Sequence, residues 1–307
     1  RHNSFFYPSA NLGFVITDFA RQMGSGLPDW ITFAKVRLSA AQVGKDPEPY
    51  KLFNTRPYKY TDGVFGPDMD SEQNTVKMNE DLKPEIKTSY EVGLDMKFFS
   101  NRLGFDFTYY NSVTKNQAMK VPASAPWVQQ WINAGKVSNQ GVELMVYGTP
   151  VQTKDFTFSL NVNLAHNRST VDELADGVNH IYFNGDAAMP VNVGAVSGGK
   201  LGDIYAKRLM RRDAAGNAII GSNGLPMVDN GNGNREQYLL DNPIGNIQPD
   251  LLMSVTPTFK WKNLSLSAML DMKFGGDIVS VSEGIATKYG TSERTLDRGE
   301  FKTINGV

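Results

Sequence analysis

The sequence contains no cysteine, only three histidines and no long run of apolar residues. The absence of cysteine excludes disulfide scaffolds, thiolate zinc sites and cysteine nucleophiles, and it suits an exported protein that must avoid stray oxidation. Without a run of about 18 apolar residues, no transmembrane helix is expected. The 31 basic and 32 acidic residues nearly cancel, so the broad positive field of nucleic-acid-binding proteins is missing. We therefore expect no nucleic-acid partner.

Patterns for catalysis and metal binding are missing as well. The histidines, at positions 2, 166 and 180, form no HExxH motif, and the sequence has no GxSxG motif. The acidic, asparagine-rich stretch 229–234 offers oxygen ligands, but Arg235 stands where an EF-hand-like loop needs glycine. A second acidic cluster, at 62–72, is interpreted as solvated surface. We expect no enzymatic activity, no cofactor and no metal site.

What the sequence does contain is apolar and polar residues in strict alternation, the pattern of a strand whose two faces meet different surroundings. In the segment 90–98, Tyr90, Val92, Leu94, Met96 and Phe98 share one face, and Glu91, Gly93, Asp95 and Lys97 share the other. The segment 103–110 alternates in the same way after a turn at 100–102, which predicts a tight hairpin.

Further hairpins follow from the same pattern. Segments 142–146 and 156–164 predict a second hairpin, and 253–261 and 264–272 predict a third. Weaker alternation at 12–16 and 36–40 predicts an opening pair, so about eight strands are expected. Pro257 lies inside a predicted strand and has no N–H to donate, which predicts a bulge or a local gap in pairing.

The predicted connections fall into two length classes. Turns near Ser100, Thr153 and Lys262 are short, whereas the segments 44–87, 113–135 and 168–249 are long. Short periplasmic turns and long extracellular loops are typical of transmembrane β-barrels. The predicted strands are also long enough to cross the roughly 25 Å apolar band of an outer membrane when tilted. Aromatic residues near the strand ends fit the girdles of such barrels: Phe98, Phe99, Phe156, Phe158, Phe259 and Trp261.

Alternation alone does not distinguish a lipid-facing surface from one that packs in a soluble core. A soluble or surface-exposed glycan-binding β-domain, such as an adhesin without transport, is therefore the alternative hypothesis. The loop asymmetry and the strand lengths favour the membrane interpretation over this alternative.

Several phrases, in this order along the chain, resemble the SusC/RagA-like TonB-dependent transporters of Bacteroidetes outer membranes. The phrases are LSAAQVG at 38–44, LKPE at 82–85, SYEVGLD at 89–95, FFSNRLGFDFTYY at 98–110, NAGK at 133–136, NQGVEL at 139–144, GDIY at 202–205, NGLP at 223–226 and FGG at 274–276. The resemblance covers nearly the whole chain, and its specificity lies in the order of the phrases.

This resemblance implies a 22-stranded antiparallel transmembrane barrel with an N-terminal plug, energised by the TonB complex. It also implies a SusD-like surface lipoprotein that captures glycans or peptides. Residues 1–307 are then expected to be a partial barrel domain of about eight strands, without the plug and the terminal strands. The expected function is uptake of oligosaccharides, less often peptides, across the outer membrane of a Gram-negative cell, with membrane lipid against the barrel.

Aromatic and amide residues in the predicted loops are the candidates for ligand contact, since sugar rings stack on Trp and Tyr while polar side chains bond the hydroxyls. The candidates are Trp127, Trp131, Tyr182, Asn184, Asp186 and Tyr205. The alternative for Trp127 and Trp131, which are four residues apart, is that they pack on each other in a short helical turn.

Overall fold

The computed structural model describes residues 5–24, 26–54, 58–61, 64–67, 75–183, 190–229, 236–297 and 306. The chain forms two compact units. Unit 1 contains residues 1–179 and 249–275, and unit 2 contains residues 180–248 and 276–307. Several residues singled out from the sequence lie outside the described ranges. They are Asn184, Asp186, the asparagine-rich stretch 230–234, and the acidic cluster at 62–72 except for residues 64–67.

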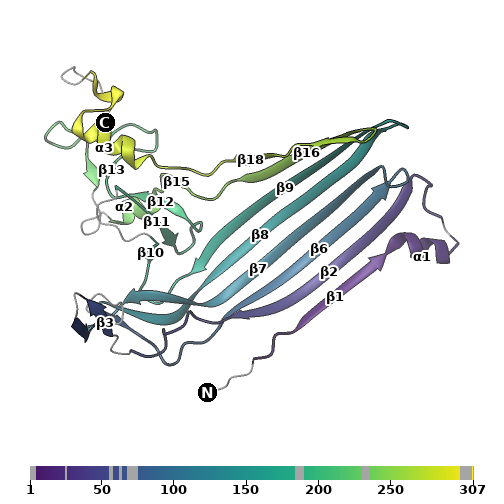
Figure 1. Ribbon diagram of the computed structural model, residues 1–307. Coiled ribbons are helices and arrows are strands. Elements are labelled where there is room, and N and C mark those ends of the chain that lie inside the picture. The colour runs from purple at the N-terminus through teal and green to yellow at the C-terminus, as the bar shows by residue number, and fades with distance from the viewer. Residues whose placement is uncertain are drawn as a thin grey trace. The chain divides into compact units, whose positions relative to one another are not determined.

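Unit 1 is a long antiparallel sheet whose strands lie side by side in chain order (Figure 1). Neighbouring strands in the main path are β1-β2-β6-β7-β8-β9-β16-β17, and β18 also pairs with β16. Their bounds are β1 Ser9–Val15, β2 Ile31–Lys45, β6 Glu85–Phe98, β7 Leu103–Pro122, β8 Gln129–Gln152, β9 Phe156–Glu173, β16 Leu251–Trp261, β17 Leu264–Ser267 and β18 Leu270–Phe274. With β17 and β18 taken as one interrupted strand, these are the eight strands that the alternation predicted.

The register places the alternating residues in continuous rows across the sheet, because directly opposed residues in an antiparallel ladder share a face. One such row is apolar throughout its length. It consists of Phe14, Val36, Leu94, Phe107, Leu144, Leu164, Met253 and Met272, each paired with the next. The sheet therefore has one apolar face from its first strand to its last.

The strands β7, β8 and β9 are longer than the sequence predicted, with 20, 24 and 18 residues. Because a transmembrane strand needs only about 9–11 residues, each of the three extends well beyond a bilayer. The prediction of a long loop at 113–135 is wrong: most of this segment belongs to β7 and β8, and only residues 123–128 connect them. The predicted long connections between β2 and β6, and between β9 and β16, are confirmed.

The gap predicted at Pro257 is present on one side of β16. Toward β9, Pro257 pairs with Leu160 in an unbroken register. On the other side, β17 ends at Ser267 and β18 begins at Leu270. Ala268 donates its N–H to the Pro257 carbonyl at 3.3 Å, but proline has no N–H to return the bond. The interruption between β17 and β18 follows from this missing donor.

Aromatic residues gather at the ends of the strands next to the short turns, as predicted. Phe158 and Phe259 lie opposite each other on β9 and β16, with ring centroids 4.8 Å apart. Trp30 stacks near Phe98 and Phe99, at centroid distances of 5.7 and 6.3 Å.

The remaining elements of unit 1 lie in the connections. Helix α1 (Ile16–Gln22) lies between β1 and β2, strands β3 (Tyr58–Thr61) and β4 (Val64–Pro67) form a small hairpin, and β5 (Val76–Lys77) pairs in parallel with β8. Buried side chains of unit 1 include Val76, Val121, Val137 and Val171. These residues lie on β5 and on the parts of β7, β8 and β9 that are farthest from the short turns. The packed core of unit 1 is therefore at the end of the sheet opposite those turns.

Unit 2 contains a four-stranded antiparallel sheet in the order β10-β11-β12-β15, with bounds His180–Tyr182, Val191–Val196, Asp203–Ala206 and Gly245–Asn246. A separate two-stranded antiparallel sheet pairs β13 (Leu209–Met210) with β14 (Val228–Asp229). Helices α2 (Glu236–Asp241) and α3 (Val281–Tyr289) and the 3-10 turn Glu293–Thr295 complete it. None of the helices in the described part of the chain has both the length and the apolar character needed to cross a bilayer.

Candidate functional site

The polar face of the unit 1 sheet carries two neighbouring rows of charged and hydrogen-bonding side chains. One row consists of Lys35, Asp95, Asp106, Met145, Asn163, Ser254 and Asp271. The next consists of Arg37, Gly93, Thr108, Glu143, Ala165, Leu252 and Lys273. These residues share the face opposite to the apolar row described above.

An ion pair ties three strands together on this face. Arg37 on β2 reaches past β6 to Asp106 on β7, with Nη2 2.5 Å from Oδ1 and 3.4 Å from the Thr108 hydroxyl. Gly93 on β6 makes this reach feasible, because a Cβ there would lie 2.7 Å from Arg37 Nε. The two charged side chains are 39% and 24% exposed, so the pair contributes at most about 1 kcal/mol to stability.

Two tyrosines also lie flat across neighbouring strands over glycines. Tyr147 covers Gly104, and Tyr110 covers Gly141 and donates its hydroxyl to Asn167 at 3.0 Å. A Cβ on Gly141 would lie 2.4 Å from the backbone oxygen of His166. The polar face is thus lined with long side chains that follow the sheet surface, because the glycines beneath them leave room.

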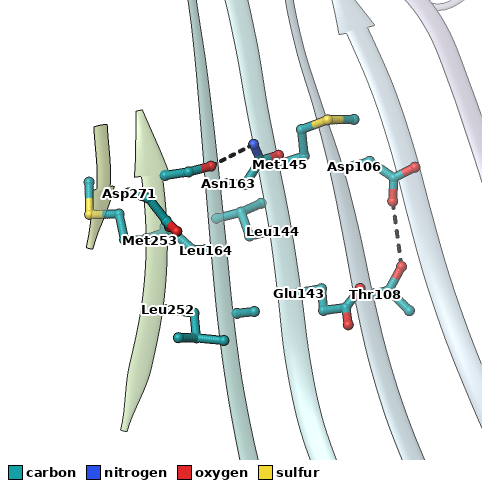
Figure 2. A pocket seen from close by; sticks show the side chains of 12 residues that line it. Asp106, Thr108, Glu143, Leu144, Met145, Asn163, Leu164, Leu252, Met253 and Asp271 are labelled. Atoms are coloured by element: carbon teal, nitrogen blue, oxygen red, sulfur yellow. Dashed lines mark hydrogen bonds between the residues drawn. The ribbon is translucent and has the colours of Figure 1, made fainter. Parts of the chain in front are cut away.

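A shallow depression of about 240 Å³ lies on the polar face over β7, β8, β9, β16 and β18. Figure 2 shows its lining, in which Asn163 donates to Ser254 at 3.0 Å and Thr108 lies beside Asp106. Six polar residues line it, and three of them carry carboxylates. The six residues are Asp106, Thr108, Glu143, Asn163, Ser254 and Asp271. Such a surface can accept hydrogen bonds from hydroxyl or amide groups of a passing solute.

The described residues hold no group of three or more His, Asp or Glu side chains placed to bind a metal ion. The depression also has no histidine or lysine beside a hydroxyl that would activate a nucleophile.

Of the residues predicted for ligand contact, Trp127 and Trp131 lie in unit 1. Trp127 is in the connection between β7 and β8, and Trp131 is in β8. A connection and a strand take the place of the predicted helical turn, so that part of the packing alternative is wrong. Trp131 has the ammonium groups of Lys51 and Lys120 at 5.1 and 5.8 Å from its ring centroid. The Trp131 indole is therefore flanked by positive charge.

Tyr182 and Tyr205 come together in the sheet of unit 2, with ring centroids 6.2 Å apart. Tyr205 is only 1% exposed, and its burial, with Asp203 nearby, raises the pKa of its hydroxyl. Asp203 in turn accepts from the Asn246 side chain at 2.8 Å. A ring this buried cannot stack on a ligand, so Tyr205 is able to act only as a support for Tyr182.

The Arg37–Asp106 ion pair and the glycine beneath it, Gly93, were not among the candidates from the sequence. The sequence did contain an indication of this contact, because all three residues occupy the polar positions of segments that alternate between apolar and polar residues. Which of these positions face one another depends on the strand register, and the sequence analysis did not assign a register between β2 and β6.

Comparisons with known proteins are consistent with this geometry. Residues 1–209 match a family model described as TonB dependent receptor-like, beta-barrel. The chain is 29% identical over 224 residues to TonB-dependent receptor SusC of Bacteroides thetaiotaomicron, which covers 69% of this chain and 22% of that protein. It is 24% identical over 220 residues to TonB-dependent receptor P3 of Formosa agariphila, covering 66% of this chain and 22% of the relative. The chain thus spans about a fifth of the length of these relatives.

Among solved structures, the fold is similar to that of the RagAB peptide importer in its open-open state. The TM-score is 0.65 at 20% identity, with 88% of this chain and 28% of that chain covered. The closed-closed state of the same importer gives a TM-score of 0.64 at 19% identity, over 88% of this chain and 29% of that chain. This likeness supports the fold.

Proposed function

Because the chain belongs to the family of TonB dependent receptor-like β-barrels, we propose that it forms part of the wall of an importer that takes up oligosaccharides. Proteins of this family are β-barrels of the outer membrane, and this chain is an antiparallel segment of such a barrel. The relatives named above are receptors and importers and not enzymes. The wall of such a protein binds and releases solutes without making or breaking covalent bonds.

The observation that carries the proposal is the contrast between the two faces of one sheet. The apolar row from Phe14 to Met272 crosses all eight strands and suits contact with lipid tails. The opposite face carries the Arg37–Asp106 pair and the polar depression, which suit water, a plug or a hydrophilic solute. A sheet that separates these two media is a membrane-spanning wall.

Oligosaccharides are the proposed substrate class because the candidate residues combine aromatic rings with polar groups. Trp127, Trp131 and Tyr182 offer flat rings, while Asn184 and Asp186 offer hydrogen bonds to hydroxyl groups. Peptides are the second candidate, and the observation in their favour is the fold similarity to the RagAB peptide importer.

The proposed partners are a SusD-like surface lipoprotein, which would deliver the ligand, and the TonB complex, which would supply energy. Membership of the TonB-dependent receptor family supports the second partner. Similarity to RagAB and to SusC supports the first. No specific observation favours the alternative of a free-standing glycan-binding adhesin.

Cysteine labelling in the intact protein tests the membrane-wall assignment, and the chain contributes no cysteine of its own. Single cysteines are introduced at Glu91, Val92, Leu94 and Asp95 and exposed, in outer-membrane vesicles, to a charged and to a lipophilic maleimide. We expect the charged reagent to label positions 91 and 95 and the lipophilic reagent to label positions 92 and 94. Equal labelling of all four positions by the charged reagent would contradict the proposal, since both faces would then meet water.

A further inference from the structure

The apolar face of the sheet has a groove of about 400 Å³ close to the short turns. Its lining is apolar except at one end, and the residues are Phe99, Arg102, Leu103, Val146, Gly148, Thr149, Pro150, Leu160 and Val162. All of them belong to β7, β8, β9 and the adjacent turns. The groove lies within unit 1 and on the face that the membrane covers.

A missing side chain creates the groove. In the next row along the strands, Phe105, Val146 and Val162 oppose one another without interruption. In the groove row, Gly148 stands between Leu103 and Leu160 and leaves the middle position empty. The β8–β9 register also shifts between Gly148 and Val151. Such an irregularity bends the strand locally.

The position of the β6–β7 turn over β8 leaves little room for a side chain at Gly148. A Cβ at Gly148 would lie 3.2 Å from the carbonyl oxygen of Arg102 and 3.4 Å from Leu103 Cδ1. The backbone approach of the β6–β7 turn to β8 therefore favours a residue without a side chain. Thr149 N donates to the same Arg102 oxygen at 2.7 Å, which fixes this approach.

No other strand of the barrel can cover the groove. The strands β6, β7, β8 and β9 each have hydrogen-bonded neighbours on both sides within the sheet. Additional strands would join at the edges of the sheet, beyond β1 and β17. In the outer membrane the surface over the groove is therefore in contact with lipid.

The polar end of the groove carries a fixed positive charge. Arg102 donates from Nε to the Thr149 carbonyl at 3.3 Å and from Nη2 to the Thr149 and Pro150 carbonyls at 3.2 and 3.0 Å. These bonds orient the guanidinium and leave Nη1 available. None of the ion pairs among the described residues involves Arg102. Its charge is complementary to a phosphate, which guanidinium groups bind with good geometry.

We propose that this groove binds one phospholipid of the periplasmic leaflet, with an acyl chain against Leu103, Val146, Leu160 and Val162 and the phosphate on Arg102. The short-turn end is the periplasmic end of such a barrel, and Phe98, Phe99 and Trp30 mark the interfacial level there. The groove thus spans from the headgroup level into the acyl region. The proposal rests on the membrane-wall assignment made under Proposed function and is independent of the imported solute.

Photocrosslinking in the intact protein, reconstituted in vesicles of phosphatidylethanolamine and phosphatidylglycerol, tests the site. The probe is a phosphatidylglycerol with a diazirine on one acyl chain, and crosslinked residues are located by peptide mass spectrometry. We expect labelling of residues 146–162 to exceed labelling around Val92, which is also on the apolar face. A headgroup-free diacylglycerol with the same diazirine should not show this preference.

Two variants and their matched controls separate the parts of the site. Arg102→Gln should lower groove labelling by about tenfold, the factor expected when a charge-assisted hydrogen bond is lost. Leu160→Trp should lower it by filling the groove. Lys154→Gln in the neighbouring turn and Val92→Trp on the same face should leave it unchanged.

Heat-modifiable gel mobility confirms that each variant is folded. Equal labelling by the two probes or unchanged labelling in Arg102→Gln would each overturn the proposal. The cysteine labelling described under Proposed function is read separately, so a failure of the lipid site is distinguishable from a failure of the membrane-wall assignment.

Discussion

Arg37 and Asp106 form an ion pair across an intervening strand, with Arg37 Nη2 2.5 Å from Asp106 Oδ1. They belong to β2 and β7, and Gly93 of β6 lies beneath the guanidinium. The pair is possible because the residue between them has no side chain. On this face, glycine positions decide which polar groups can meet.

The first prediction compares two glycines of the polar face. Gly93→Ala should displace the flexible end of Arg37 and cost about 1 kcal/mol, the value of an exposed ion pair. Gly141→Ala should cost about 1–3 kcal/mol, because its Cβ meets the backbone oxygen of His166, which cannot move aside. The midpoint of heat modification of the intact barrel measures both changes.

The control for this comparison is the Arg37→Ala background. There the effect of Gly93→Ala should disappear, since the displaced side chain is already gone, while that of Gly141→Ala should persist. Additive effects at Gly93 and Arg37 would show that they do not interact.

The second prediction concerns the interrupted strand opposite Pro257. Pro257→Val supplies an N–H opposite Ala268, which already donates to the residue 257 carbonyl. We expect the pairing between β17 and β18 to become continuous and the barrel to gain about 0.5–1.5 kcal/mol. Hydrogen exchange of segment 264–272 measures the change. Unchanged or faster exchange would mean that the missing donor is not the cause of the gap.

The third prediction tests Trp127 and Trp131. Replacing Trp127 and Trp131 by Ala should lower uptake of the oligosaccharide substrate in the intact transporter without lowering its abundance in the outer membrane. A matched control is Trp30→Ala, which removes an aromatic ring at the short-turn end, far along the strands from the ligand loops. If abundance falls in step with uptake in the Trp127 and Trp131 variants, these residues serve packing.

The fourth prediction concerns pH and the turn that begins at Asp213. The side chain and backbone of Asn217 donate to this carboxylate, followed by Ala215 N–H, and they lower the pKa of Asp213. Because the folded pKa lies below the unfolded one, the stabilisation is complete above the unfolded value of about 3.9 and is lost as the pH falls through the folded pKa. Protection factors for segment 213–217 should therefore fall in acid and stay constant from about pH 5 to 7.

The control for the pH experiment is Asp213→Asn, which keeps the size of the side chain and does not titrate. Its protection factors should not depend on pH over the same range. A parallel fall in this variant would assign the acid sensitivity to another group.

The sequence alone determined the eight strands, the two faces and the short-turn end. Residues such as Val92 and Glu91 alternate because each strand separates two media, and this period of two is a local property that can be read without the fold. The gap at Pro257 was also predictable, since a residue without an N–H loses a ladder bond in any sheet. Ordered phrases of residues carried the family resemblance.

The tertiary structure decided which polar residues contact one another and where the apolar face has a groove. Arg37 finds Asp106, and Gly148 opens a groove between Leu103 and Leu160, only because the registers of separate hairpins place them side by side. The extension of β7 and β8 through 113–135 and the burial of Tyr205 likewise depend on neighbouring strands. Register and burial arise from contacts between residues far apart in the chain, so local alternation does not specify them.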